Sequence, residues 1–221
     1  MQNFPPINII RSFRKTLSLH ISSKGELIVK APFFIPEKII QDFINQKEDW
    51  VLRSLQKVKN SKLFQKTYQE GEEFLYLGDV YKFHLGDFKE ISFKNGLLNF
   101  PLFMKFRAKK ELTSWYIKSA QQEITSLVKH FSLKMNTEYK SIRFSDTSSK
   151  WGSCGRDNSL QFNWRLIMAP LLVINYVVIH ELSHTTEKNH GSKFWNKVDL
   201  YTPSYKQQRK WLKKNHHLLS I

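Results

Sequence analysis

The stretch Pro170-Leu-Leu-Val-Ile-Asn-Tyr-Val-Val-Ile-His-Glu-Leu-Ser-His184 decides the fold of this 221-residue chain. A proline is well tolerated at the start of a helix, because the N–H that it lacks would have no partner there. From Leu171 to Ile179 every residue except Asn175 is apolar, so the helix has no polar face that could remain in water. The stretch therefore predicts a buried helix that ends in a polar motif.

The motif at the end of this helix is His180-Glu181-Leu182-Ser183-His184. Residues four apart lie on the same face of a helix, so both imidazoles can reach one metal ion, while Glu181 projects beside them where a metal-activated water would lie. Without a metal, two imidazoles and a carboxylate would be desolvated unpaired. The motif predicts His180 and His184 as metal ligands and Glu181 as the catalytic residue.

A catalytic zinc site usually has three protein ligands, so a third donor is needed. No glutamate follows Glu187, and Asp199 is the single acidic residue after it. His190 fits better, because it follows His184 by the interval found in metzincins, although the midway glycine and the later methionine of that clan are missing. His190 is therefore expected as the third ligand, delivered by a turn of another shape. The alternative is a helix C-cap residue ahead of Gly191, which would leave the third position to Asp199 or Cys154.

The segments before the helix supply candidate cleft residues. A strand is expected at Ile142–Phe144, then a loop at 148–155, then a strand at Leu160–Leu166 in which apolar and polar residues alternate. Asn163 and Arg165 lie on the polar face of that strand. We expect them to bind substrate, because an edge strand beside an active-site helix commonly pairs with an extended peptide.

Cys154 lies in the loop and has two interpretations. It is either a fourth metal ligand or redox latch, or a small buried hydrophobic residue. We favour the structural role, because lone cysteines are most often buried.

The first hundred residues predict hairpins around one amphipathic helix. Hairpins are expected at the turns Ser22–Gly25, Gly78–Asp79 and Asn95–Gly96, and a helix with a buried face is expected to begin at Pro36. A long helix then begins near Lys105. We therefore expect two domains, a β-rich module at 1–104 and a metallohydrolase domain at 105–221.

Four blocks carry a family resemblance. They are Trp151–Cys154, Phe162–Leu166 with Ala169-Pro170, Tyr176–His184 with Asn189-His190, and Phe194-Trp195 with Trp211-Leu212. In these blocks the chain resembles the YgjP-like metal-dependent hydrolases, which are grouped with M48-type and SprT-like zinc metallopeptidases. The resemblance implies zinc bound by His180, His184 and His190, with Glu181 as general base. The implied fold class is α+β, with a zincin-like catalytic part in which the HExxH helix packs on a small mixed sheet.

Composition excludes several other classes of protein. Apolar residues make up 41% and charged residues 24% of the chain, as in ordinary soluble proteins. No run approaches the roughly 20 apolar residues of a membrane span, and the N-terminus has no secretory signal pattern. The one cysteine excludes an intrachain disulfide. We expect a cytoplasmic protein that does not bind membranes.

The net charge is the one unusual bulk property. Lys and Arg number 35 against 19 Asp and Glu, which gives +16. The excess favours anionic partners, although the lysines are spread along the chain as in a generally basic proteome. We predict a hydrolase with one zinc ion per chain that acts on peptides or proteins. The alternatives are a metal-dependent nucleotide hydrolase that cuts a phosphoanhydride, and a nucleic-acid-associated protein with a structural zinc.

Overall fold

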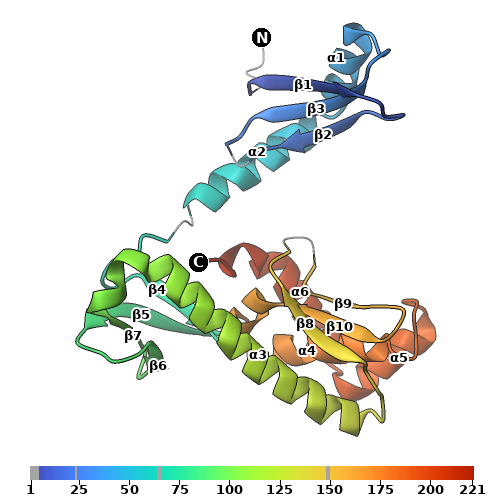
Figure 1. The fold of residues 1–221 in the computed structure, drawn as a ribbon. Helices are drawn as coiled ribbons and strands as arrows, with labels where there is room; N and C mark the ends of the chain where they lie inside the picture. The colour runs from blue at the N-terminus through green and yellow to red at the C-terminus, as the bar shows by residue number, and fades with distance from the viewer. Residues whose placement is uncertain (1–4, 23, 64–65, 148–149) are drawn as a thin grey trace. The chain divides into compact units, whose positions relative to one another are not determined.

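The chain divides into two units between Gln65 and Lys66 in the computed structural model, which describes residues 5–22, 24–63, 66–147 and 150–221 (Figure 1). Each unit has a hydrophobic core of its own. The boundary expected between 104 and 105 therefore falls inside the second unit.

The first unit is a three-stranded sheet with two helices. Its elements are β1 (Ile7–Ser12), β2 (Ser18–Ile21), β3 (Leu27–Pro32), α1 (Glu37–Gln46) and α2 (Glu48–Leu63). The strand order is β1-β3-β2, with β1 parallel and β2 antiparallel to β3. Its core is small and aliphatic: Leu27, Val29, Ala31, Ile40, Ile44 and Val51.

Two expectations for this unit can be compared with the structure. The β2–β3 hairpin is confirmed. The single expected helix is wrong, because the chain closes a tighter turn at Lys47, whose N–H donates to the Ile44 carbonyl, and α2 begins at the next residue. Strand β1 was not predicted, because it pairs in parallel with β3 and no short turn marks such a pair in the sequence.

The second unit begins with a four-stranded sheet. Its strands are β4 (Glu73–Tyr76), β5 (Asp79–Gly86), β6 (Ser92–Lys94) and β7 (Leu97–Pro101), in the order β4-β5-β7-β6. Both expected hairpins are confirmed, although the first one turns at Leu77 and Gly78, one residue earlier than expected. At the second hairpin Asn95 and Gly96 have φ of 52° and 74°, and a type I′ turn needs positive φ at both positions.

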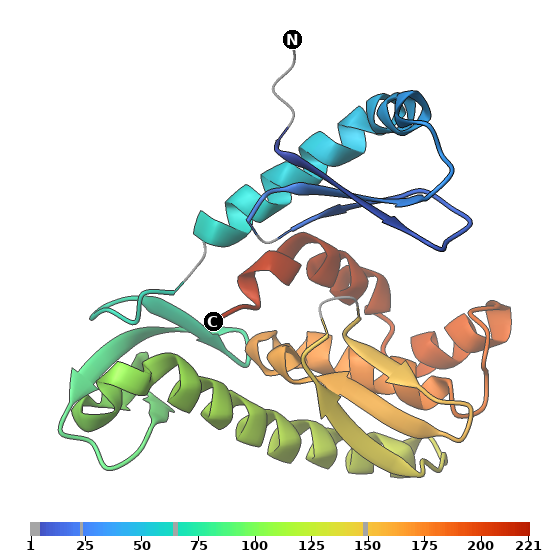
Figure 2. The ribbon, with the colours of Figure 1, turned by 45° about the horizontal axis from the view of Figure 1, so that its top comes forward.

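This sheet shares its hydrophobic core with the rest of the second unit. The observed boundary between the units therefore lies before the sheet, between Gln65 and Lys66. After a short 3-10 helix, η1 (Leu102–Arg107), the long helix α3 (Ala108–Lys134) covers the sheet and continues along the unit (Figure 2). The Tyr116 hydroxyl on α3 donates to the Leu75 carbonyl at 2.7 Å. The Leu77 N–H donates to the Ile167 carbonyl at 2.8 Å. The segment 73–101, which lies before the expected boundary, is thus hydrogen-bonded to residues that lie after it.

A second, small mixed sheet carries the site. It consists of β8 (Ser141–Ser145), β9 (Gly152–Cys154) and β10 (Ser159–Asn163), with β10 in the centre, parallel to β8 and antiparallel to β9. The helix α4 (Leu171–Ser183) packs beside β9. The expectation of an α+β fold with a helix against a small mixed sheet is met by this arrangement.

The expected strand at Leu160–Leu166 is too long. It ends at Asn163, whose side-chain oxygen accepts the Arg165 N–H at 2.9 Å and so caps the 3-10 helix η2 (Trp164–Met168). The expected loop at 148–155 contains the edge strand β9, and residues 148 and 149 lie outside the described residues.

Two helices and a 3-10 turn complete the unit: α5 (Ser192–Tyr201), α6 (Tyr205–Asn215) and η3 (His216–Leu218). Both α5 and α6 pack against α4. Among the described residues, no helix has the combination of length and apolar composition that crossing a bilayer requires.

Candidate metal centre

Helix α4 brings His180, Glu181 and His184 together at its C-terminal end. The helix is buried over most of its length, as its apolar sequence predicts. His184 is its C-cap residue, and the His184 N–H still donates to the His180 carbonyl, at 3.3 Å. The two imidazoles therefore keep helical spacing and face the same side.

His190 completes a cluster of three imidazoles. Its Nε2 atom lies 3.1 Å from Nε2 of His180 and 3.2 Å from Nε2 of His184. Nitrogens bound to a tetrahedral zinc with bonds of about 2.0–2.1 Å are about 3.3 Å apart. The separations fit one ion between the three rings.

The hydrogen bonds of the cluster support the same conclusion. Nδ1–H of His184 donates to the Glu187 carbonyl at 2.9 Å, so Nε2 of a neutral His184 presents a lone pair. His190 Nε2 carries at most one hydrogen and can donate to only one of its two neighbours. In the other pair, the two nitrogens would then face each other with their lone pairs, and the lone pairs repel. A cation that accepts all three lone pairs removes this conflict, and three neutral imidazoles are a donor set that suits zinc.

The loop between α4 and α5 delivers His190. Because α4 ends at Ser183 and its C-cap is His184, the alternative of His190 as the C-cap of this helix is wrong. The loop is tied by side chains, since Lys188 Nζ donates to Asn158 Oδ1 at 2.6 Å and Lys197 Nζ donates to Thr186 Oγ1 at 2.9 Å. These bonds tie the loop to the β9–β10 turn and to α5 without a glycine between His184 and His190.

Phe194, on α5, forms an aromatic floor beneath the three rings. Its ring is fully buried, and its centroid lies 4.4 Å from that of His184, 4.7 Å from that of His190 and 4.9 Å from that of His180. Because the Phe194 ring contacts all three imidazole rings, it limits their rotation. The hydrophobic environment also lowers the pKa of His180 to about 3, chiefly by burial, with the other two histidines acting in the same direction.

Glu181 is enclosed beside the triad of His180, His184 and His190. Its side chain is 5% exposed, and burial raises its pKa to about 8, although the nearby Lys150 ammonium acts in the opposite direction. Gly152 of β9 makes room for the carboxylate, since a Cβ there would lie 2.6 Å from Glu181 Oε1. Strand β9 therefore touches the carboxylate that the sequence predicts to be catalytic.

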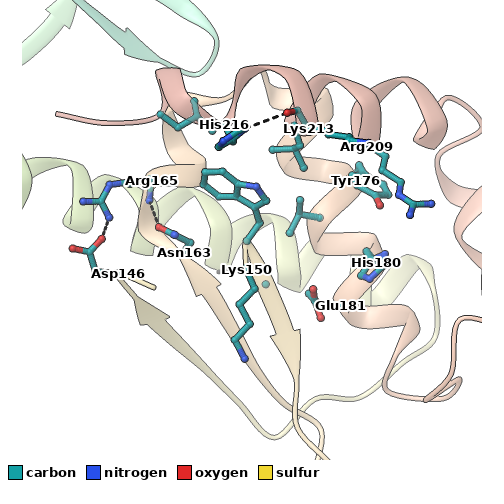
Figure 3. Close-up of a pocket in the computed structure, with 15 residues that line it drawn as sticks. Asp146, Lys150, Asn163, Arg165, Tyr176, His180, Glu181, Arg209, Lys213 and His216 are labelled. Atoms are coloured by element: carbon teal, nitrogen blue, oxygen red, sulfur yellow. Dashed lines mark hydrogen bonds and ion pairs between the residues drawn. The ribbon is translucent and has the colours of Figure 1, made fainter. Parts of the chain in front are cut away.

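A cavity of about 710 Å³ opens beside His180 and Glu181 (Figure 3). Asn163 and Arg165 both line it, at the end away from His180. Asn163 is buried, and its amide donates to the Thr147 carbonyl at 2.7 Å. Arg165 is ion-paired with Asp146. Both candidate substrate residues thus reach the cavity wall, from a central strand and the turn after it rather than from an edge strand.

Two other candidate ligands lie outside the cluster. Within the part of the chain that the structure describes, the group able to hold a metal consists of His180, His184 and His190, without Cys154 or Asp199. Cys154 is half-buried, and burial raises the pKa of its thiol. Cys154 is thus half-buried rather than fully buried, and its structural role stays a prediction.

Sequence reasoning gave no role to Tyr176, Phe194 and Arg209. Tyr176 is buried and lines the cavity, and its spacing of four residues from His180 was a usable signal. Phe194 belongs to one of the family-like blocks. Arg209 lies far along the chain, on α6, and no local pattern connects it with the triad.

The site combines a buried glutamate with three clustered imidazoles, on a helix that packs against a small mixed sheet. This combination is typical of metallopeptidase-type hydrolases. A family model described as the YgjP-like metallopeptidase domain matches residues 15–215, so the chain belongs to the YgjP-like family. The wider grouping with M48-type and SprT-like peptidases stays an expectation.

Two solved structures show more distant similarity. One is the metallopeptidase zymogen jannalysin of Methanocaldococcus jannaschii, 22% identical over 41% of this chain and 94% of that chain, with a TM-score of 0.38. The other is the metallopeptidase zymogen abylysin of Pyrococcus abyssi, 17% identical over 41% of this chain and 93% of that chain, also with a TM-score of 0.38. A search of curated proteins found no match.

Proposed function

We propose that the protein is a zinc-dependent peptidase in which His180, His184 and His190 hold one zinc ion and Glu181 is the general base. The observation that carries the proposal is the convergence of three Nε2 atoms, 3.1 and 3.2 Å apart, next to a carboxylate that is 5% exposed. Family membership supports a peptide or protein substrate. It offers no support for a nucleotide.

The bound zinc would supply Lewis acidity and a water of lowered pKa. Glu181 accepts the proton of the attacking water at a carboxylate oxygen and passes it to the leaving amine. Its carboxylate packs against Gly152 of β9 and is largely shielded from bulk solvent, which restricts its orientation. Burial raises the pKa of Glu181, so its carboxylate is a stronger base than that of an exposed glutamate.

The peptide is expected to lie along β9. This strand is at the edge of its sheet on the side of α4, so its outer backbone groups can pair with an extended chain. Pairing there would bring a peptide carbonyl past Glu181, because Gly152 is in contact with that carboxylate. The central position of β10 leaves its backbone already paired on both sides.

Asn163 and Arg165 keep their proposed role in substrate binding, at the far end of the cavity. Asn163 holds the turn that presents Arg165, through its bond to the Arg165 N–H. Arg165 and Asp146 together offer a polar, charge-balanced wall to a peptide.

The decisive experiment is Glu181→Gln in zinc-loaded protein, assayed on unfolded casein and short peptides. Gln preserves shape but cannot take the proton, so turnover should fall by about 10² to 10⁴ with zinc content unchanged. Asp199→Asn is the matched control, because it makes the same change of group on an exposed residue outside the cluster and should retain both zinc and turnover. Wild-type turnover in Glu181→Gln would refute the mechanism.

A further inference from the structure

The wall of the cavity opposite β9 is basic. Helix α6 and the turn after it contribute Arg209, Lys213 and His216, which follow one another at intervals of four and three residues and so share one helix face. Lys150 joins them from the other side of the cavity. Three permanently charged basic side chains and a histidine therefore line the cavity next to the triad, in addition to Arg165.

The negative charges of the cavity do not balance this wall. Asp146 is already paired with Arg165, and Glu181 is the other carboxyl group in the lining. Among the described residues, neither Arg209 nor Lys213 has a carboxylate within ion-pair distance. The positive charge of α6 is available to a ligand.

Arg209 is held in position near the proposed site of reaction. Its guanidinium lies 5.4 Å from the centre of the Trp195 ring, and Trp195 itself stacks on Tyr205 with centroids 5.1 Å apart. In Figure 3 the Arg209 side chain lies beside Tyr176, which is on the same helix as His180. A ligand group bound to Arg209 would thus be close to the peptide bond at the triad.

The rest of the lining limits the kind of anion. Val177, Leu212, Leu219 and the Trp151 ring give the cavity an apolar body, and its volume of about 710 Å³ is enough for more than one amino-acid residue. An apolar body with basic groups at its margin suits an amino-acid residue that ends in a single carboxylate. A polyphosphate would leave the apolar surface unused.

We infer that this cavity binds a carboxylate of the peptide substrate through Arg209 and Lys213, either the free C-terminal carboxylate or an Asp or Glu side chain next to the cleaved bond. This inference rests on the proposed peptidase function. Both sources present the same group to the same cations, and they differ in where the cleaved bond lies relative to the end of the peptide.

The test uses N-acetylated alanine heptapeptides with one central Phe, offered to zinc-loaded full-length protein. One pair differs by a free or amidated C-terminus, and further amidated pairs have Glu or Gln at each position flanking the Phe. We expect kcat/KM about tenfold higher for the carboxylate member of at least one pair, as for one hydrogen bond between charged groups. A preference in the first pair identifies the C-terminal carboxylate, and one in the others identifies a side chain.

The double variant Arg209→Gln/Lys213→Gln should reduce this preference to about twofold or less. Lys210→Gln/Lys214→Gln is the matched control, because it removes the same charge from exposed residues of α6 outside the cavity lining and should keep the preference. Equal cleavage of both members of every pair by the wild type overturns the inference. A preference that survives in Arg209→Gln/Lys213→Gln overturns it as well.

A binding measurement separates this inference from the proposed function. The zinc-loaded Glu181→Gln protein is titrated calorimetrically with the same pairs, where turnover is not needed. Binding of a carboxylate member about tenfold tighter than its neutral twin supports the inference even if the wild type cleaves none of the peptides. Equal affinities within every pair contradict it, whatever the activity.

Discussion

The three histidines are placed in two different ways. His180 and His184 are separated by one turn of a buried helix, so backbone geometry alone puts their rings on one face. His190 is exposed and lies in the loop before α5, where side-chain bonds to the β9–β10 turn hold the backbone. The comparison teaches that the helix backbone positions two of the proposed ligands, while the third depends on side-chain contacts of a surface loop.

The largest effect is expected when a helix ligand is lost. His180→Ala or His184→Ala should abolish metal binding, because the variant keeps a single helix imidazole and depends for its second ligand on the exposed loop residue His190. Metal analysis of the purified proteins measures this. Full zinc occupancy in either variant would show that the helix pair is not the foundation of the site.

A smaller but still large effect is expected for the loop ligand. His190→Ala should weaken zinc binding by more than the 10–100-fold typical of a lost outer-sphere partner, because a direct ligand is removed. The fold should remain intact, since His190 is exposed and contributes nothing to the core. Competition with a chelator gives the affinity and thermal unfolding gives the stability. Unchanged affinity would transfer the third position to another donor.

The smallest effect is expected when only the hydrogen bond that holds the loop in place is removed. Lys188→Met keeps the aliphatic stem but removes the bond to Asn158 Oδ1, so His190 should be less well positioned and zinc affinity should fall about tenfold, the low end for outer-sphere partners. Lys193→Met is the control, because it is an exposed lysine nearby for which the structure shows no such bond. Equal affinities of the two variants would mean that the loop holds its shape without Lys188.

Local sequence patterns predicted much of the fold. The hairpins near Gly78 and at Asn95–Gly96 and the start of α4 directly after Pro170 follow from turn chemistry and periodicity, which act between near neighbours. The short strand β9 was not predicted, because three residues give no readable alternation. The break at Lys47 was missed for a similar reason, since the apolar pattern continues across it.

The sequence by itself determined the chemistry of the candidate site on α4. His180, Glu181 and His184 owe their arrangement to helical spacing, and the apolar residues before them ensure that the helix is buried. His190 was a prediction from spacing that the sequence left open against a C-cap role. Only the tertiary structure brought its Nε2 to 3.1 Å from that of His180.

The tertiary structure also decided what surrounds these residues. Phe194 lies under the rings, Gly152 lies against Glu181, and Arg209 faces the same cavity, although the three belong to α5, β9 and α6. The physical reason is that helical periodicity relates residues within about one turn, whereas contacts between separate elements depend on how buried surfaces pack. That packing depends on the whole core and cannot be predicted from the sequence of any one segment.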